Sequence, residues 1–409
     1  MTLAESSPPR PTVADEPVLR VRDLRVGYRT PRGPLWAVDG VDLDVAPGES
    51  VGLVGESGCG KSSLGRALLN LMPPGGGVRG EVRLAARGDA PGEDAVDLVS
   101  ASSSALRSIR GNRVSLVFQE PMTRLDPLMR VSAHFVEAIR SHRPETSKRE
   151  AHAMAQAALA QMGIPRTRVD NFPHEFSVGM RQRIMIALGI VMHPQLVIAD
   201  EPTTSLDVIV EAQILDILGR LRRDENVGLL LVTHNLGIVA ETCDRVAVMY
   251  AGKIVEIGPV ADVFANPKHP YTQGLLASTI SLETTELHSI AGAPPDLVDP
   301  PPGCRFAPRC PEVMAHCTDV VPRLTPVGGA HTGPVTPPDA ASRTGASDQQ
   351  ASPGAPVRIG ATDQQASPRA PVRNDPAAPP SDVDTTERGS QYAACLLHPG
   401  ADPRGKGPQ

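Results

Sequence analysis

Eight consecutive residues, G55-E-S-G-C-G-K-S62, have the types and spacing needed to bind a phosphate. Glycines in so short a run let the backbone curl until several N–H groups point at one anion. An apolar, strand-like run precedes them and a helical run follows, so a helix N-terminus would face the same anion. The run predicts a phosphate-binding loop in which Lys61 reaches the β- and γ-phosphates and the Ser62 hydroxyl binds Mg²⁺. A plain Gly/Ser turn is the simpler alternative, and the full eight-residue match argues against it.

A second stretch supplies carboxylates where hydrolysis would need them. The run L196-V-I-A-D-E201 has the apolar character of a buried strand and ends in two acidic residues. Asp200 is placed to hold the Mg²⁺ shell, and Glu201 to polarise an attacking water. Acidic turn residues after a strand are the simpler alternative. They are disfavoured because the pair follows a phosphate loop and continues into T203-T-S-L-D207.

A third stretch, F176-S-V-G-M-R-Q-R183, lies between the other two and places a Ser/Gly turn at the start of a helix. The N-terminus of a helix presents free N–H groups and the positive end of the helix dipole. Such a start can therefore bind a γ-phosphate by the same physics as the first loop.

The composition excludes several classes of protein. Among 409 residues, 40 Lys and Arg stand against 46 Asp and Glu, which argues against general nucleic-acid binding. No run of 18 or more apolar residues occurs, so we do not expect the chain to span a membrane. The N-terminus MTLAESSPPRP lacks the basic start and apolar core of a signal peptide, which indicates a cytoplasmic protein. In a reducing cytoplasm, the six cysteines suit metal binding better than disulfides.

Strand-like and helix-like segments alternate from Val18 to Phe264. This alternation, opened by a phosphate loop, predicts a mainly parallel α/β sheet with ligands at the C-terminal ends of its strands. Farther on, D348-Q-Q-A-S-P-G-A-P-V-R358 returns as D363-Q-Q-A-S-P-R-A-P-V-R373, which indicates a linker. We divide the chain into a disordered N-terminus 1–16, a nucleotide-binding domain 17–264 with a helical part at about 125–190, an extension 265–324, a Pro/Ala-rich linker 325–390, a segment 391–398 that returns to the extension, and a disordered tail 399–409.

Together these motifs resemble those of the ATP-binding cassette (ABC) ATPases, in that family's order. The resemblance covers nearly all of residues 18–264 and adds Gln119 in V117-F-Q-E120 and His234 in L231-V-T-H234. It implies a P-loop NTPase domain of α/β class, with a RecA-like, mainly parallel sheet core, an antiparallel β subdomain and a helical subdomain. A small Cys-containing C-terminal extension follows here. The resemblance also implies ATP and Mg²⁺ as ligands and ATP hydrolysis as the reaction.

The resemblance assigns a role to each matching residue. Tyr28 would stack on adenine, although an aromatic residue on a half-buried strand is the simpler interpretation. Gln119 would meet Mg²⁺ and the attacking water and contact the membrane subunits. His234 would sense the γ-phosphate, whereas a lone His after a strand is otherwise structural. The catalytic set is then Lys61, Gln119, Glu201 and His234, the Mg²⁺ ligands are Ser62, Gln119 and Asp200, and the nucleotide contacts are Tyr28, Gly55, Glu56, Ser57, Gly58, Cys59, Gly60, Lys61, Ser62, Ser63, Gln119, Ser177, Gly179, Asp200 and Asp207.

A single copy of the family's cassette is incomplete, because the signature of one cassette (176–180 here) closes over the nucleotide on another. The chain has one phosphate loop and one signature, so it needs a second ABC ATPase subunit, identical or paralogous. The signature departs from the family pattern at Val178, where glycine is usual. Since valine tolerates a positive φ poorly, this position has either ordinary backbone angles or a strained turn.

The region after residue 264 resembles the C-terminal region of oligopeptide and dipeptide importer ATPases, whose relatives also import nickel complexes. The matching motifs are H269-P-Y271 and G303-C-R-F-A-P-R-C310, and Met180 suits the family's "D"-type ATPase. The resemblance implies a peptide-importer ATPase that is peripheral on the cytoplasmic face of the cell membrane. It would dock on two membrane permease subunits and be served indirectly by an extracellular substrate-binding protein. Import of nickel or a metal chelate is one alternative, and a soluble ABC protein acting on nucleic acid or ribosomes is another.

Four cysteines, Cys304, Cys310, Cys317 and Cys395, form a further candidate site. Four thiolates are the ligand set of a [4Fe–4S] cluster, and the family resemblance points to the same cofactor. Zinc is the alternative, since thiolates suit it as well, and plain free cysteines are the simplest interpretation. The long linker does not forbid the site, because loop-closure cost rises only logarithmically with length. Residues 391–398 would then fold back onto 300–320.

Overall fold

The structure is a computed structural model, and the residues that it describes all belong to one compact unit. Gln119 lies outside the described residues, as do both copies of the repeat and nearly all of the two predicted disordered ends. The residues that the structure describes are 16–87, 94–118, 124–204, 206–278, 289–327 and 389–398.

The larger of two sheets runs in the order β11-β12-β10-β9-β3-β8-β7-β6 through the described residues. Its central strands β9, β3, β8, β7 and β6 are parallel, and β10 is antiparallel to β9. Every residue of β3, β7, β8 and β9 is buried, as expected for parallel strands covered on both faces. The strands are β3 (Ser50–Val54), β6 (Val114–Val117), β7 (Leu196–Asp200), β8 (Gly228–Val232), β9 (Arg245–Tyr250), β10 (Lys253–Pro259), β11 (Thr325–Pro326) and β12 (Tyr392–Ala393).

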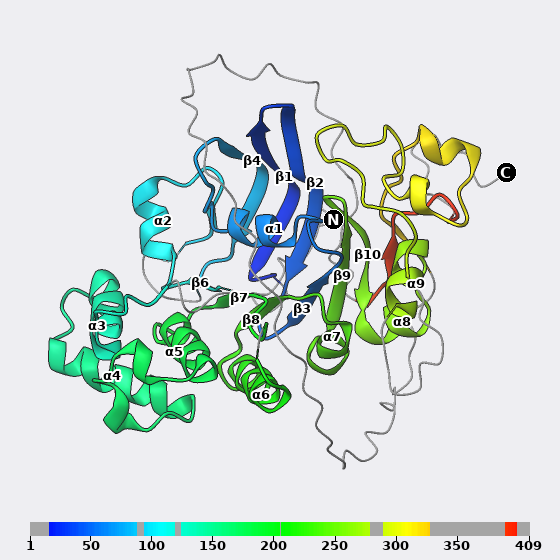
Figure 1. Ribbon diagram of the computed structural model, residues 1–409. Coiled ribbons are helices and arrows are strands. Elements are labelled where there is room, and N and C mark those ends of the chain that lie inside the picture. The colour runs from blue at the N-terminus through cyan, green and yellow to red at the C-terminus, as the bar shows by residue number, and fades with distance from the viewer. Residues whose placement is uncertain are drawn as a thin grey trace, which may run out of the picture. The chain divides into compact units, whose positions relative to one another are not determined.

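The smaller sheet is antiparallel, in the order β2-β1-β4-β5. Apolar residues of β1 such as Leu19, Val21 and Val26 are fully buried, and they share one core with Leu53 of β3 and with helix α1. Figure 1 shows β1, β2 and β4 beside the parallel strands, with α1 in front of them. The strands are β1 (Leu19–Thr30), β2 (Gly33–Val45), β4 (Gly76–Leu84) and β5 (Val96–Asp97).

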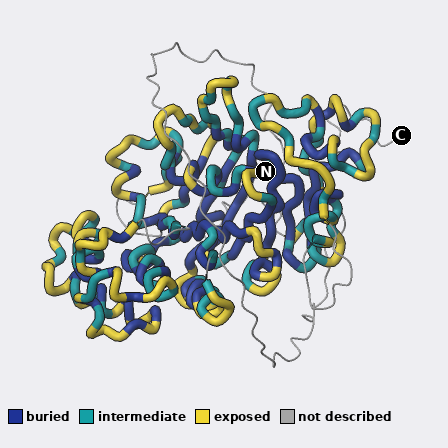
Figure 2. The backbone as a smooth tube through the Cα atoms, in the orientation of Figure 1, coloured by how far each residue is buried: buried dark blue, intermediate teal, exposed yellow. Residues whose placement is uncertain are grey.

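Helices α3, α4 and α5 pack together and join α6 in a second core on the parallel sheet. They form the group at the lower left of Figure 1, and Figure 2 shows buried residues concentrated in the strands and exposed residues along the outer turns. Among the described residues, no helix combines the length and apolar character that crossing a membrane requires. The helices are α1 (Lys61–Ala67), α2 (Ser103–Ile109), α3 (Val131–His142), α4 (Lys148–Gln161), α5 (Val178–Ile190), α6 (Val208–Glu225), α7 (Leu236–Thr242), α8 (Val260–Ala265) and α9 (Pro270–Ala277), with 3₁₀ turns at Arg166–Arg168, Pro173–Glu175, Ala307–Arg309 and Ala315–Thr318.

The C-terminal extension is joined to the cassette through β10. Strand β12 pairs with β10 and β11, so residues 392–393 lie beside β10, as Figure 1 shows. Glu256 of β10 has no exposed surface and accepts hydrogen bonds from the N–H groups of Lys268 and His269 and from the side chain of Gln391. One buried carboxylate thus ties the start of α9 and the 391–398 segment to the same strand.

Candidate nucleotide-binding site

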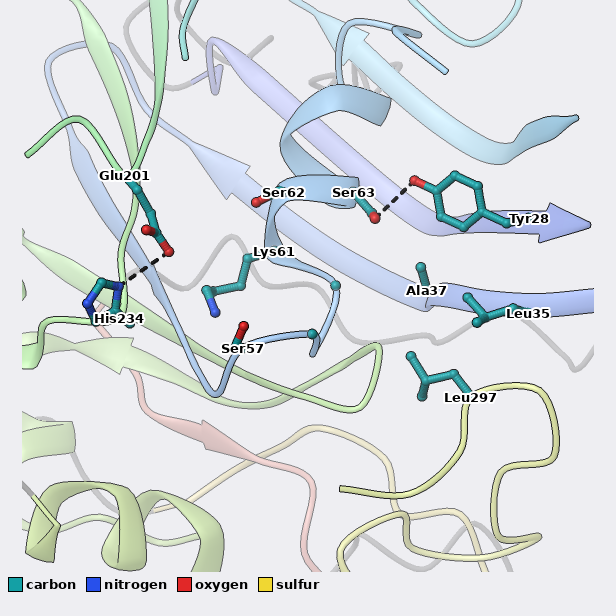
Figure 3. Close-up of a pocket in the computed structure, with 12 residues that line it drawn as sticks. Tyr28, Leu35, Ala37, Ser57, Lys61, Ser62, Ser63, Glu201, His234 and Leu297 are labelled. Atoms are coloured by element: carbon teal, nitrogen blue, oxygen red, sulfur yellow. Dashed lines mark hydrogen bonds and ion pairs between the residues drawn. The ribbon is translucent and has the colours of Figure 1, made fainter. Parts of the chain in front are cut away.

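A cavity of about 630 Å³ opens at the C-terminal ends of β3, β7 and β8. Figure 3 shows that its two ends differ in character: Glu201 and His234 lie at one end, with Lys61 and Ser57 between them and the apolar residues Leu35 and Leu297. A ligand with a charged part and an apolar part fits such a division. The lining residues are Tyr28, Leu35, Ala37, Ser57, Gly58, Gly60, Lys61, Ser62, Ser63, Glu201, His234 and Leu297.

The curl of the phosphate loop depends on glycine at two positions where neighbouring backbone comes close. At Gly60 the φ angle is +111°, and a Cβ there would lie 2.1 Å from the carbonyl oxygen of Ala37. At Gly55 the φ angle is +150°, and a Cβ would lie 2.1 Å from the carbonyl oxygen of Met249. Both positions are closed to residues with a side chain, so β2 and β9 fix the shape of the loop.

Lys61 brings a positive charge to the middle of the cavity. Its Nζ donates to the carbonyl oxygens of Gly55 at 2.7 Å and Glu56 at 3.0 Å, and the residue is only 6% exposed. The loop that would surround a phosphate therefore also holds the ammonium group. A buried cation partnered by neutral carbonyls still favours an anion nearby.

Ser62 lines the cavity and forms an oxygen pair with Asp200, which is not among the lining residues. The Ser62 hydroxyl donates to Asp200 Oδ1 at 3.0 Å, which joins the start of α1 to the end of β7. Burial raises the pKa of Asp200 above its ordinary value. Hydroxyl and carboxylate oxygens are the donors that Mg²⁺ takes in proteins, so this pair fits the ion.

Glu201 and His234 meet from the ends of neighbouring strands. His234 Nδ1 lies 3.3 Å from Glu201 Oε1, and the Thr204 hydroxyl donates to Glu201 Oε2 at 2.8 Å. The φ angle of Glu201 is +48°, a left-handed conformation that is uncommon for a residue with a long side chain. Such backbone strain concentrates at functional sites, and here it belongs to the residue that faces the cavity.

The other end of the cavity has an aromatic and aliphatic lining. The Tyr28 hydroxyl donates to Ser63 Oγ at 3.0 Å, and Tyr28 pairs with Leu35 across β1 and β2. Sequence reasoning missed Leu35, Ala37 and Leu297. The first two could have been found from the turn between two strands that follows Tyr28, whereas Leu297 comes from the extension and no local pattern places it here.

Three predicted loop contacts do not line the cavity, namely Gly55, Glu56 and Cys59. Gly55 shapes the loop, because its backbone packs directly against the carbonyl group of Met249. Cys59 is 5% exposed, and its sulfur lies 3.8 Å from Lys61 Nζ. Burial raises the pKa of the Cys59 thiol, which keeps it protonated. Glu56 faces the C-terminal extension instead, as described below.

The signature residues and Asp207 also lie outside the cavity's lining. The Ser177 side chain accepts a hydrogen bond from the Met180 N–H and caps α5, and Asp207 caps α6 in the same manner. Gly179 lets the two helices approach, because a Cβ there would lie 2.7 Å from a methyl group of Val210. Val178 has a negative φ and begins α5 in ordinary helical geometry, so the substituted glycine position carries no strain.

The cysteine site is not supported. All four cysteines lie in the described residues, and among those residues no group of three or more His, Cys, Asp or Glu side chains is arranged to hold a metal ion. Burial raises the pKa of Cys304, of Cys310 and, to about 12, of Cys395, with smaller contributions from the neighbouring thiols. Cys317 packs among Ala307, Val320 and Leu396, and Cys304 packs against the same cluster. The four cysteines therefore lie in one region of the fold, but their thiols are not arranged as metal ligands. This geometry supports neither an iron–sulfur cluster nor zinc.

The fold and the cavity define a nucleotide-binding domain of the P-loop class, and comparison with known proteins gives its family. Residues 38–204 match the family model of the ABC transporter, and residues 255–317 match that of the oligopeptide/dipeptide transporter, C-terminal region. The chain belongs to the ABC transporter family, within its ATP-binding subunits. The predicted α/β P-loop fold and the predicted family are both confirmed.

The relatives carry names of one kind. The chain is 44% identical over 321 residues to the dipeptide transport ATP-binding protein DppD of Bacillus subtilis, which covers 78% of this chain and 93% of the relative. It is 46% identical over 326 residues to a putative peptide import ATP-binding protein of Brucella melitensis, covering 77% and 96%. It is also similar to the oligopeptide transport ATP-binding protein OppD of Mycobacterium tuberculosis, at 44% identity, 77% of this chain and 51% of the relative.

Among solved structures, the fold is similar to the dimeric structure of the bacterial ABC transporter cassette MJ0796. The TM-score is 0.52 at 23% sequence identity, and the match covers 59% of this chain and 98% of the other. At this level of identity the comparison bears on the fold alone.

Proposed function

We propose that this protein is the ATP-hydrolysing subunit that powers import of dipeptides or oligopeptides across the cytoplasmic membrane. The observation that carries the proposal is the similarity, over 77–78% of this chain, to ATP-binding proteins named for peptide transport, together with the matched C-terminal region 255–317. The cavity supports the ATPase part of the proposal independently, because its two ends suit a triphosphate and a base.

In this proposal the loop binds the triphosphate. Lys61 exchanges its hydrogen bonds to the carbonyls of Gly55 and Glu56 for bonds to the β- and γ-phosphates. Ser62 and Asp200 hold Mg²⁺, which when bound neutralises charge on the phosphate oxygens. Tyr28 lies beside the base, with Leu35 and the other apolar lining residues around it.

Glu201 and His234 carry the hydrolysis. Glu201 accepts the proton of the attacking water, and its contact with His234 orients the carboxylate toward the cavity. His234 stabilises the charge that develops on the γ-phosphate. Gln119, which lies outside the described residues, completes the set by orienting the water and contacting a membrane subunit.

The site acts as half of a pair. Ser177, Gly179 and Asp207 lie away from this chain's own cavity, on a surface where Val178, Val208 and Ile209 are 43%, 58% and 71% exposed. Large apolar side chains exposed together favour a protein partner. A second ABC ATPase subunit, identical or paralogous, would cover them and place its nucleotide against this signature.

We place the subunit on the cytoplasmic face of the membrane, docked peripherally on two permease subunits and served indirectly by an extracellular substrate-binding protein. The alternative of a nickel importer is not favoured, because the relatives reported above are named for peptides. Action on nucleic acid is not favoured either, because the formal net charge is −6.

Uptake measurements test the proposal. A strain lacking the gene is complemented with the wild-type chain or with Glu201→Gln, and the uptake of radiolabelled di- and tetra-alanine and of ⁶³Ni²⁺ is measured. We expect peptide uptake to return only with the wild-type chain and nickel uptake to stay the same in all strains. The proposal would be overturned if nickel uptake required the wild-type chain, or if peptide uptake were the same with and without it.

A further inference from the structure

The first variable residue of the phosphate loop, Glu56, is held by the C-terminal extension. The backbone N–H of Glu56 donates to the Tyr271 hydroxyl at 2.9 Å. Its two carboxylate oxygens accept from Nη1 and Nη2 of Arg309 at 2.8 and 3.0 Å. The two bonds from Arg309 join residues 253 positions apart, so they connect the loop to a part of the chain outside residues 38–204, which match the ABC transporter model.

Every N–H donor of the Arg309 guanidinium makes a hydrogen bond. Its Nε donates to the Ala291 carbonyl at 2.9 Å, Nη1 also donates to the Tyr250 hydroxyl at 3.3 Å, and Nη2 also donates to the Ile290 carbonyl at 3.2 Å. With the two bonds to Glu56, all five N–H donors of the guanidinium are used. The Arg309 side chain is 5% exposed and that of Glu56 is 25% exposed, so the guanidinium is shielded from water while the carboxylate is partly exposed. A guanidinium held in this way presents a rigid fork to the carboxylate.

An aromatic cluster supports both contacts. The rings of Tyr250 and Tyr271 have centroids 4.5 Å apart, and Phe306 packs against them with centroids 5.2 and 5.5 Å away. Tyr271 and Phe306 both belong to the extension, and Phe306 is three residues before Arg309. The extension therefore presents the hydroxyl and the guanidinium to Glu56 from one packed surface.

We infer that Arg309 is a positioning residue for ATP binding, acting through Glu56 on the phosphate loop. Glu56 also offers its carbonyl oxygen to Lys61 Nζ, so its backbone position sets where the lysine lies. Without the fork, the Glu56 side chain would lose its anchor, and of the bonds between Glu56 and the extension only that of its backbone N–H to the Tyr271 hydroxyl would remain. The inference rests on the proposed function, because it concerns the same nucleotide site.

The loop holds the phosphates before and during hydrolysis, so loss of its anchor weakens both states equally. We therefore expect Arg309→Ala to raise KM for ATP about tenfold while kcat stays within about twofold, since small misplacements of binding groups carry penalties of this size. Arg309→Lys keeps the charge without the fork and should restore only part of the affinity. A purely structural role would change stability and leave KM as it is.

The pair itself is tested by a double-mutant cycle. Glu56→Gln alone should weaken ATP binding less than Arg309→Ala, and the double variant should be no weaker than Arg309→Ala, because the second change finds the interaction already lost. The matched control is Arg32→Ala. Arg32 also pairs with the extension, through Asp296 at 2.6 Å, but both side chains are largely exposed and neither contacts the loop.

The experiment uses the full chain. Binding of a trinitrophenyl derivative of ATP is followed by fluorescence, KM and kcat are measured in the assembled transporter, and melting of each variant is recorded. An unchanged KM in folded Arg309→Ala, additive effects in the cycle, or an equal effect of Arg32→Ala would each overturn the inference. If Arg309→Ala does not fold, Arg309→Lys and Glu56→Gln decide by the same criterion. Lys61→Ala separates the two proposals: if it hydrolyses ATP normally, the proposed function fails, whatever Arg309 does.

Discussion

The nucleotide cavity and the C-terminal extension hold their polar groups in opposite ways. In the cavity, Lys61, Glu201 and His234 line the space that a ligand would occupy. Where the extension joins β10, Glu256 and His269 are buried, and the N–H groups of Lys268 and His269 bond to Glu256. The difference indicates that the side chains of the cavity are arranged to bind a ligand, whereas the buried groups around Glu256 stabilise the fold. Substitutions of the groups that face the cavity should therefore change turnover, and substitutions of the buried groups around Glu256 should change stability.

Among these substitutions, Lys61→Ala should impair the function of the cavity most severely. Losing the charge that meets the phosphates is expected to lower ATP turnover by about a hundredfold or more. The free energy of unfolding should change by no more than about 2 kcal/mol, because only the two hydrogen bonds from Nζ to the carbonyls of Gly55 and Glu56 are removed. Steady-state ATPase assays and urea titration of the same variant measure both quantities. If the Lys61→Ala protein were destabilised but still hydrolysed ATP at the wild-type rate, Lys61 would have a structural role and not a binding role.

Gly60→Ala should damage the loop through its backbone alone. A Cβ would clash with the Ala37 carbonyl at 2.1 Å, so we expect ATP binding to fall by at least about tenfold. The matched control is Gly58→Ala. Gly58 also has a positive φ, +80°, but no atom lies within 4 Å of a Cβ there, so only about 1 kcal/mol of backbone strain is expected. Fluorescence titration with nucleotide separates the two, and equal effects would contradict the steric account.

The contrast also explains what the sequence could predict. The phosphate loop is eight contiguous residues whose shape follows from its glycines, so the pattern alone placed Lys61 and Ser62 in the cavity. Asp200 and Glu201 followed because parallel strands end at the same edge of a sheet. The cysteines had no such local rule: Cys317 and Cys395 are separated by a long linker, and spacing does not determine how their thiols are oriented. Leu297 and Arg309 were missed because only tertiary folding brings them to the cavity and the loop.

Glu256→Ala should destabilise the junction between β10 and the extension. It leaves two buried N–H groups and the Gln391 amide without their acceptor, so the free energy of unfolding should fall by about 2–3 kcal/mol. KM for ATP should stay within about twofold, since Glu256 does not reach the loop. Glu241→Ala, at an exposed position, is the control for urea titration. A change in KM without a change in stability would contradict the division between the regions.

His269 gives the extension a dependence on pH. Burial, aided by the nearby His398, lowers the pKa of His269 from 6.5 to about 3. The unfolded chain binds a proton that the folded chain does not, so this contribution is complete above pH 6.5 and is lost as the pH falls toward 3. Between pH 7.5 and pH 5, the loss should reach about 2 kcal/mol.

Urea titration of the wild type and of His269→Asn at both pH values isolates this contribution. Asparagine keeps an acceptor for the Tyr271 N–H, which His269 now bonds at 3.0 Å, but does not titrate. Stability of the variant should fall less between the two pH values. The same fall in both proteins would show that His269 is not responsible.

Val178→Gly should have the smallest effect. Because Val178 is already helical and 43% exposed, restoring the usual glycine relieves no strain. We expect ATP turnover of the assembled transporter to change by no more than about twofold. A large gain in turnover would mean that the signature is constrained in a way that its backbone geometry does not reveal.

The central claim is that Glu201, held beside His234 at the end of the cavity, carries ATP hydrolysis. The most direct measurement is ATP turnover by Glu201→Gln, assembled with its second cassette and permeases, alongside nucleotide binding by the same variant. The account predicts a loss of turnover of about a hundredfold or more with binding retained, because a general base is removed and the phosphate loop is not. Turnover at the wild-type rate would contradict it.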